Sequence, residues 1–313
     1  MEPAVEPAPP SFEYGYVPEV GNNSNTSSTG HLPQDYRFAL LVIYALILLG
    51  GTLNVVIMSC MLQSRRRLSF TNVSVINLIL VHSLFLLTVP FRIFYYASNT
   101  WSLGLHFCKI VSVMIHAHMY LAFIFYVLLL IVRYIEHSRS KRLLDFHRVF
   151  HATVASAVVW LVIFGSMFPP TMLKYGLSAS DSTQCFHFGE ALKDSAVKIL
   201  NYLICTTVLL VWTVLLFFQI YFLLYVGKKY GTRDRQEFWV ELKNAVFLMV
   251  MFFCFVPYQV FRIYYVSKDV SSDSEIQNKN EIFLAFTAFS CFDMIVFAGR
   301  DLYKNIMSKG CMH

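Results

Sequence analysis

Long runs of hydrophobic residues alternate with short polar segments along most of the chain. A helix needs about 20 mostly apolar residues to cross a hydrocarbon core of roughly 30 Å. Seven runs are long enough, and no soluble domain is inserted between them. The predicted spans are residues 36–62, 71–98, 106–137, 149–173, 195–226, 238–267 and 280–298. We therefore expect an all-α membrane protein whose seven-transmembrane helix bundle occupies residues 36–298.

The basic residues of the linkers predict the orientation of this bundle, because cytoplasmic linkers carry an excess of Lys and Arg. They gather in the first, third and fifth linkers and after the last span, at Arg65, Arg66, Arg67, Arg139, Lys141, Arg142, Arg148, Lys228, Lys229, Arg233, Arg235, Arg300, Lys304 and Lys309. The other linkers are acidic or balanced. We expect an extracellular N-terminus and a multi-pass protein of the plasma membrane, in contact with membrane lipids.

The composition agrees with lipid as a second solvent. Hydrophobic residues make up 57% of the 313 residues and charged residues only 14%, whereas about 25% charged is usual for soluble domains. The seven cysteines include no Cys-x-x-Cys pair, which disfavours a zinc ribbon or a thioredoxin-like site. The sequence also lacks motifs for hydrolases and phosphate loops and the internal repeats of transporters. We predict no enzyme, no cofactor and no nucleic-acid partner.

Two terminal segments flank the bundle. Residues 1–35 are rich in Pro, Glu, Asn and Ser, which predicts a disordered extracellular tail rather than a signal peptide. Asn22 and Asn25 begin glycosylation sequons in this tail. Residues 299–313 predict a short amphipathic eighth helix lying on the membrane, with Cys311 as a palmitoylation site. A frayed tail with an ordinary cysteine is the alternative.

Short motifs occur at fixed places along the spans. In chain order they are Gly50-Gly51-Thr52-Leu53-Asn54, Asn77-Leu78, Trp101, Cys108, Arg133-Tyr134, Trp160, Pro170, Cys185, Phe252-Phe253-Cys254-Phe255-Val256-Pro257-Tyr258 and Ser290-Cys291-Phe292-Asp293. Each motif is weak alone. Their order and spacing together resemble the class A (rhodopsin-like) G-protein-coupled receptors, in the purinergic-like branch, over nearly the whole membrane region.

This resemblance implies roles for several residues. It implies a disulfide between Cys108 and Cys185 on the oxidising extracellular side, and contact of Arg133 with a heterotrimeric G protein. Phe255 stands where the family usually has a tryptophan switch, and Tyr221 is the candidate inner tyrosine of the fifth span. The other coupling, switch and bundle-core positions fall on Tyr134, Glu237, Pro257, Asp293, Asn54 and His82.

The family usually has an acidic residue directly before the arginine of the third span. In this chain Val132 occupies that position, directly before Arg133. Glu237, at the cytoplasmic start of the sixth span, is the predicted substitute partner of Arg133. A partly solvated pair of this kind contributes about 1 kcal/mol or less. We therefore expect a loosely held inactive state and raised basal activity.

The centre of the bundle departs furthest from the family pattern. His82 occupies the position of the aspartate that usually binds sodium in the family. Ala122 and Phe289 occupy positions where polar sodium ligands are common. We expect no sodium site. We interpret His82 as a buried partner of Asp293, because two opposite partners offset the cost of burial.

Ionisable residues inside a membrane are costly and are read as functional by default. Those near the extracellular ends of the spans are Arg92, Lys198, Arg262, His116 and His118. With Met119 and Tyr258 they predict a positively charged ligand cavity. Because arginine forks bind carboxylate or phosphate, the expected ligand is an anionic small molecule or lipid.

Two observations limit this ligand hypothesis. Arg92 and Lys198 could instead reach the membrane interface, or pair with Asp194 or Glu281. Ile115 occupies the position where amine receptors carry an aspartate, so the sequence disfavours a monoamine ligand.

The sequence as a whole favours a signalling receptor, in which an extracellular ligand shifts an equilibrium towards an open cytoplasmic face. One alternative is a non-signalling binder or heterodimer partner, because many switch motifs have drifted; the retained Arg133-Tyr134 argues against it. Another is a proton sensor, because several of the ten histidines lie near the predicted outer face.

Overall fold

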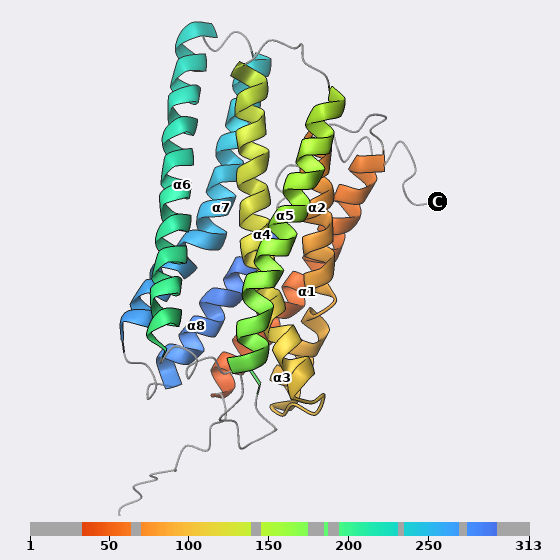
Figure 1. Ribbon diagram of the computed structural model, residues 1–313, viewed down its shortest axis with the longest axis vertical. Helices are drawn as coiled ribbons and strands as arrows, with labels where there is room; N and C mark the ends of the chain where they lie inside the picture. The colour runs from red at the N-terminus through yellow and green to blue at the C-terminus, as the bar shows by residue number, and fades with distance from the viewer. Residues whose placement is uncertain are drawn as a thin grey trace, which may run out of the picture. The chain divides into compact units, whose positions relative to one another are not determined.

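The computed structural model describes residues 33–63, 70–138, 145–174, 185–186, 194–230, 235–268 and 274–292. These residues form helices and no strand, as the sequence predicts. The elements in chain order are α1 (Gln34–Gln63), α2 (Phe70–Leu86), α3 (Val89–Ser98), α4 (Leu105–Ser138), α5 (Asp145–Lys174), α6 (Ser195–Tyr230), α7 (Arg235–Ser267), α8 (Ser274–Thr287) and the 3₁₀ helix η4 (Ala288–Phe292). Figure 1 shows the long helices running side by side.

Six stretches within the described residues are helical, long and apolar enough to cross a membrane. They correspond to the first six predicted spans, with α2 and α3 together making the second. The predicted seventh span begins in α8 and continues through η4 to Phe292, where the described part of the chain ends. The predicted eighth helix lies outside the described residues.

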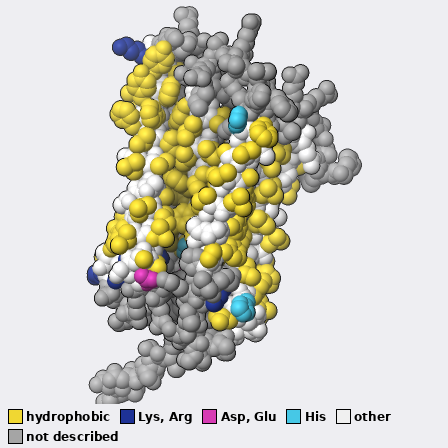
Figure 2. Space-filling view, in the orientation of Figure 1, with side chains coloured by type: hydrophobic (Ala, Val, Ile, Leu, Met, Phe, Trp, Pro, Cys, Tyr) yellow, Lys and Arg dark blue, Asp and Glu magenta, His cyan; other side chains and the backbone are white. Residues whose placement is uncertain are grey.

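Large hydrophobic side chains cover the outside of the bundle. Leu161 of α5 is 74% exposed, and Phe217 and Leu224 of α6 are 71% and 68% exposed. Figure 2 shows hydrophobic side chains across the middle of the visible face. A soluble monomer rarely exposes apolar patches of this extent, so the solvent of this surface is lipid.

The second predicted span is two helices rather than one. α2 ends at Leu86, a turn at Leu87 and Thr88 follows, and α3 begins at Val89. Pro90 lies in the first turn of α3. Its ring has no N–H to donate and would clash with the carbonyl of Leu86 in a continuous helix.

α4 is the most buried of these spans and contacts helices on several sides, including α2, α5, α7 and η4. A hydrogen-bonded triplet joins α2 to α5: the Trp160 indole donates to Asn77 Oδ1 at 2.8 Å, and Asn77 Nδ2 donates to Ser156 Oγ at 3.0 Å. The motif residues Asn77 and Trp160 therefore hold two helices against each other.

Candidate functional site

The disulfide between Cys108 and Cys185 fixes one end of the bundle, which we call the disulfide end. Cys108 lies in the first turn of α4, and the two Cα atoms are 5.9 Å apart. The next residue, Phe186, is buried and has a left-handed φ of 71°. Such a backbone is uncommon for a bulky residue and persists only when its surroundings hold it. The disulfide thus places an aromatic ring inside the bundle.

Arg92 of α3 lies beneath this ring and is fully buried. Its guanidinium donates to the Tyr44 hydroxyl at 3.2 Å and to the Val111 carbonyl at 3.1 Å. The guanidinium carbon is 4.3 Å from the centre of the Phe186 ring, a cation–π distance. Its Nε has no hydrogen-bond partner. Arg92 therefore does not reach the membrane interface, which was one alternative from the sequence.

Arg262 of α7 joins three helices at the same end. Its Nε donates to Asn201 Oδ1 of α6, and its Nη1 donates to Asn280 Oδ1 of α8, both at 3.2 Å. The Tyr265 ring lies 5.0 Å from its guanidinium carbon. Both hydrogen-bond acceptors are neutral amides, so the buried positive charge is held without being neutralised by these partners.

Glu281 of α8 is the buried carboxylate near both arginines. It interacts electrostatically with Arg92 and Arg262, yet neither forms an ion pair with it within salt-bridge distance. Its carboxyl group interacts with the buried hydroxyl of Tyr96, although the two groups do not meet the geometry of an ordinary hydrogen bond. We call Arg92, Arg262 and Glu281 the charged cluster; it carries two positive charges and one negative when all three are ionised.

The other predicted ligand residues lie at different distances from this cluster. His116 interacts electrostatically with both arginines and contacts the Ser112 carbonyl at 3.2 Å. Tyr258 is buried and interacts electrostatically with Arg262. Met119 accepts a hydrogen bond from Gln259 at 3.7 Å. Lys198 lies in the first turn of α6.

His118 faces a different part of the bundle from His116, which corrects the expectation that both line the ligand cavity. Two residues on an α-helix are separated by about 200° of rotation, so they point to nearly opposite sides. His118 Nε2 lies 3.0 Å from His82 Nδ1 and 3.3 Å from Cys291 Sγ. His82 thus has His118 and Cys291 as neighbours. Its predicted partner Asp293 lies outside the described residues.

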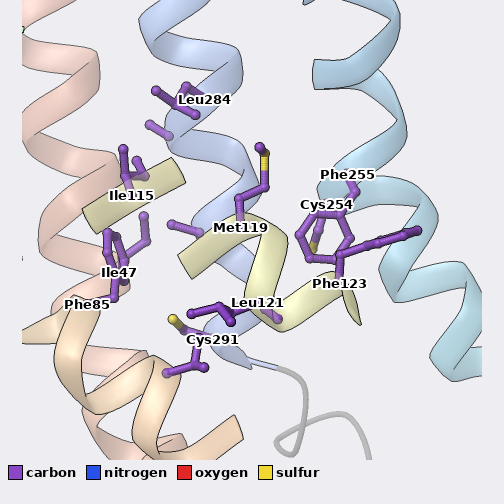
Figure 3. Close-up of a cluster of buried hydrophobic side chains, with 14 of the residues drawn as sticks. Ile47, Phe85, Ile115, Met119, Leu121, Phe123, Cys254, Phe255, Leu284 and Cys291 are labelled. Carbon is purple, nitrogen blue, oxygen red and sulfur yellow. The ribbon is translucent and has the colours of Figure 1, made fainter. Parts of the chain in front are cut away.

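A layer of aromatic rings lies beside these residues. Phe255 packs against Phe123 with ring centres 5.6 Å apart and against Tyr126 at 6.1 Å. The Tyr126 hydroxyl donates to the Ser290 carbonyl of η4 at 2.9 Å. Figure 3 shows Phe255 beside Phe123 within the buried cluster. Pro257 lies inside α7, two residues after Phe255. Its ring has no N–H, so the helix loses one backbone hydrogen bond there.

Glycines let α1 approach the last described element. A Cβ at Gly50 would overlap the Phe292 ring, and one at Gly51 would lie 2.9 Å from Leu86 Cδ2. Asn54, one turn further along, is buried and its Nδ2 lies 3.5 Å from Met58 Sδ. The first motif therefore serves close helix packing.

At the other end of α4, Tyr134 is buried and donates to Gln219 Oε1 of α6 at 2.6 Å. Its ring stacks on Phe222 with centres 5.2 Å apart. Tyr221, predicted to be the inner tyrosine of this span, is 57% exposed on the outer face of α6. Gln219 and Phe222 are the residues of α6 that contact Tyr134, and the assignment of the inner tyrosine to Tyr221 stays a prediction.

Several predicted site residues are outside what the structure describes. Arg133 lies in α4 and Glu237 in α7, but their side chains are not described. Asn22, Asn25, Asp293 and Cys311 lie wholly outside the described residues.

Sequence reasoning missed several residues that surround the charged cluster. Tyr44, Asn201, Asn280 and Phe186 are neutral or aromatic and carry no sign of function in an apolar chain. The only signal was that Asn201 and Asn280 are polar residues within predicted spans. Glu281 was foreseen only as an alternative partner of Arg92 or Lys198.

Comparison with known proteins agrees with this geometry. A family model described as "7 transmembrane receptor (rhodopsin family)" matches residues 53–295. The chain is 41% identical over 273 residues to human "Probable G-protein coupled receptor 141", covering 85% of this chain and 90% of that protein. The strings Gln236-Glu237-Phe238-Trp239 and Pro257-Tyr258-Gln259 suggest the same relative from sequence alone.

Two further relatives are more distant. "Probable G-protein coupled receptor 34" of Pan troglodytes is 26% identical over 299 residues, 88% of this chain and 77% of that protein. The "N-arachidonyl glycine receptor" of Rattus norvegicus is 26% identical over 241 residues, 74% of this chain and 72% of that protein. With its long apolar helices, this chain is a multi-pass plasma-membrane protein that belongs to the rhodopsin family of seven-transmembrane receptors.

Proposed function

We propose that this receptor binds an acidic small molecule or lipid at the disulfide end of the bundle and signals to a heterotrimeric G protein at the other end. The observation that carries the proposal is the charged cluster, in which two buried arginines share one carboxylate. The Lys and Arg bias of the linkers supports an extracellular position for this end.

The charge balance of the cluster favours an anion. A buried charge without a partner is strongly unfavourable, and two guanidinium groups with one carboxylate leave one positive charge over. Arg92 Nε still has an N–H to donate. A carboxylate or phosphate would neutralise the extra charge and accept from an arginine fork.

The position of Arg262 supports a route from ligand to signal. Its hydrogen bonds join α7 to α6 and α8. A ligand anion that competes with Asn201 and Asn280 for the guanidinium would weaken those ties. A ligand shifts an equilibrium only by its different affinity for two states, and a contact that changes the packing of α7 supplies such a difference.

The name of one relative points to the same chemistry. The "N-arachidonyl glycine receptor" is named for an acyl glycine, which combines a carboxylate with a long apolar chain. Such a ligand has an acidic group for the arginines and a tail compatible with the surrounding aromatic and aliphatic side chains. We extend this ligand class to the present chain as part of the proposal.

G-protein coupling is proposed to pass through Arg133 near the end of α4. The neighbouring Tyr134 ties α4 to α6 through Gln219, so a change in α6 reaches the arginine. Val132 leaves Arg133 without the usual acidic neighbour. We therefore propose raised basal activity, restrained by Glu237 at the start of α7.

The ligand proposal is tested in cells with a panel of acyl glycines, fatty acids, dicarboxylates, nucleotides and lysophospholipids, read by G-protein activation. For an acidic agonist, Arg262→Gln should reduce potency at least tenfold, because a charge-assisted hydrogen bond contributes about 1.5–3 kcal/mol. Lys268→Gln is the matched control, since Lys268 is an exposed cation about two turns away. Equal agonist potency in wild type, Arg262→Gln and Arg92→Gln, at equal surface expression, contradicts the proposed site.

A further inference from the structure

Three potential metal ligands from three separate elements meet at the centre of the bundle. His82 of α2, His118 of α4 and Cys291 of η4 are all buried, and their ligand atoms lie within 4.8 Å of one another. The contacts are 3.0 Å between His82 Nδ1 and His118 Nε2, 3.3 Å between Cys291 Sγ and His118 Nε2, and 3.5 Å between Cys291 Sγ and His82 Nδ1. Figure 3 shows Cys291 pointing into the buried cluster near Phe85.

We propose that these three residues bind a zinc ion. Zinc takes imidazole nitrogen at about 2.0–2.1 Å and thiolate sulfur at about 2.3 Å in tetrahedral geometry, so its ligand atoms are roughly 3.3–3.6 Å apart. The three observed separations fall within a few tenths of an ångström of that spacing. Three protein ligands leave a fourth position for water, as in many three-ligand zinc sites.

The hydrogen bonds around His82 aim its lone pair at this site. The Tyr126 hydroxyl donates its proton to the Ser290 carbonyl at 2.9 Å, so it can only accept from His82 Nε2, which lies 3.4 Å away. The proton of neutral His82 is then on Nε2, and Nδ1 presents a lone pair to the cluster. A second ring nitrogen held by an outer partner is the usual arrangement of a metal-binding histidine.

Hydrogen bonding and metal binding use the facing atoms of this cluster differently. Each imidazole nitrogen offers either one proton or one lone pair, so the facing nitrogens of His82 and His118 can form only one hydrogen bond with each other. His118 Nδ1 is on the far side of its ring from these facing atoms and has no hydrogen-bond partner. A cation bound to all three facing atoms satisfies every one of them at once.

The donor set selects zinc over sodium. Sodium, calcium and magnesium prefer oxygen ligands, whereas imidazole and thiolate suit zinc and copper. The thiolate form of Cys291 also supplies one negative charge against the charge of the ion. Zinc would hold α2, α4 and η4 together, so the bound ion would stabilise the arrangement described here. This inference does not depend on the ligand or on G-protein coupling.

The test uses the full-length receptor purified in detergent, treated with a chelator and titrated with Co²⁺ as a spectroscopic substitute for Zn²⁺. We expect one cobalt per receptor, the visible bands of tetrahedral Co²⁺ and a thiolate-to-cobalt charge-transfer band that Zn²⁺ abolishes. Cys291→Ser should remove the charge-transfer band, and His118→Gln should weaken binding at least tenfold. Cys254→Ser and His151→Gln are the matched controls. Each should leave the charge-transfer band and the cobalt affinity unchanged.

A wild-type measurement keeps the test decisive if a variant fails to fold. Zn²⁺ should slow alkylation of Cys291 by a maleimide at least tenfold, read by peptide mass spectrometry, and leave the rate at Cys60 unchanged. Cobalt binding without a charge-transfer band, or a band that persists in Cys291→Ser, would show that surface histidines bind the ion adventitiously and would overturn the site. Equal alkylation of Cys291 with and without Zn²⁺, at a temperature at which the metal-free receptor does react at Cys291, would also overturn it.

Discussion

Arg92 illustrates what a single residue in an apolar chain reveals. Its charge inside a predicted span marks it as functional, and the structure places it in the charged cluster with Arg262. Its actual partners are separated from it by 48 residues at Tyr44 and 19 at Val111. Neutral partners at such separations follow from packing, which the local sequence does not specify.

His82 shows the same limit at the centre of the bundle. The sequence indicates that no sodium site survives and that a buried histidine needs a partner. It does not identify His118 and Cys291 as those neighbours, because it assigns His118 to the ligand cavity and gives Cys291 only as part of a motif of the last span. Helix periodicity alone could have separated His118 from His116, since residues two apart face opposite sides.

Glu281 should compete with an acidic ligand for the two arginines. Glu281→Gln removes that negative charge and leaves two positive charges for the ligand. We expect the potency of an acidic agonist to rise about three- to tenfold, which corresponds to about 0.6–1.4 kcal/mol. Concentration–response curves of G-protein activation at matched surface expression measure this, and lower potency in the variant would contradict the competition.

The helices as elements were predictable, but their breaks and faces were less so. Six predicted spans coincide with long apolar helices to within a few residues. The break between α2 and α3 could have been placed from Pro90, which cannot continue the helix from Leu86. The inward face of α6 was harder to predict, because a helix that is apolar on all sides has no amphipathic pattern. The role of Tyr221 therefore stays a prediction.

Close packing of α1 against η4 depends on Gly50. Gly50→Ala puts a Cβ into the Phe292 ring, and overpacking of this kind costs about 1–3 kcal/mol. We expect a lower thermal unfolding temperature of the purified receptor. Gly165→Ala is the control, because no atom lies within 4 Å of its new Cβ; an equal or larger loss of stability there would contradict the packing argument.

The proposed link between α4 and α7 predicts the effect of Glu237. Glu237→Ala removes the partner of Arg133 and should raise basal G-protein activation up to about fivefold, since an exposed pair contributes about 1 kcal/mol or less. Glu241→Ala, one turn further along α7, is the comparison variant. Basal signal in Glu237→Ala no higher than in wild type would remove this restraint from the account.

At the scale of the whole molecule, the order and spacing of motifs identified the family, although each motif alone was weak. That information survives drift because it depends on helix length and on the positions of Cys108, Arg133 and Pro257 rather than on any one interaction. The ligand and the G protein cannot be predicted in this way, because they depend on individual side-chain contacts rather than on the spacing of motifs. The charged cluster lies at one end of the bundle and Arg133 near the other. The proposed function requires that a ligand bound at the cluster changes the coupling through Arg133.

The most direct measurement is basal G-protein activation in cells carrying a panel of Gα sensors, with no added ligand. Wild type and Arg133→Ala are compared at matched surface expression, with mock-transfected cells as the baseline. The account predicts that wild type activates at least one Gα family above the baseline and that Arg133→Ala returns the signal to it. A wild-type signal equal to the baseline in every sensor, or a signal unchanged by Arg133→Ala, would contradict a self-active receptor coupled through Arg133.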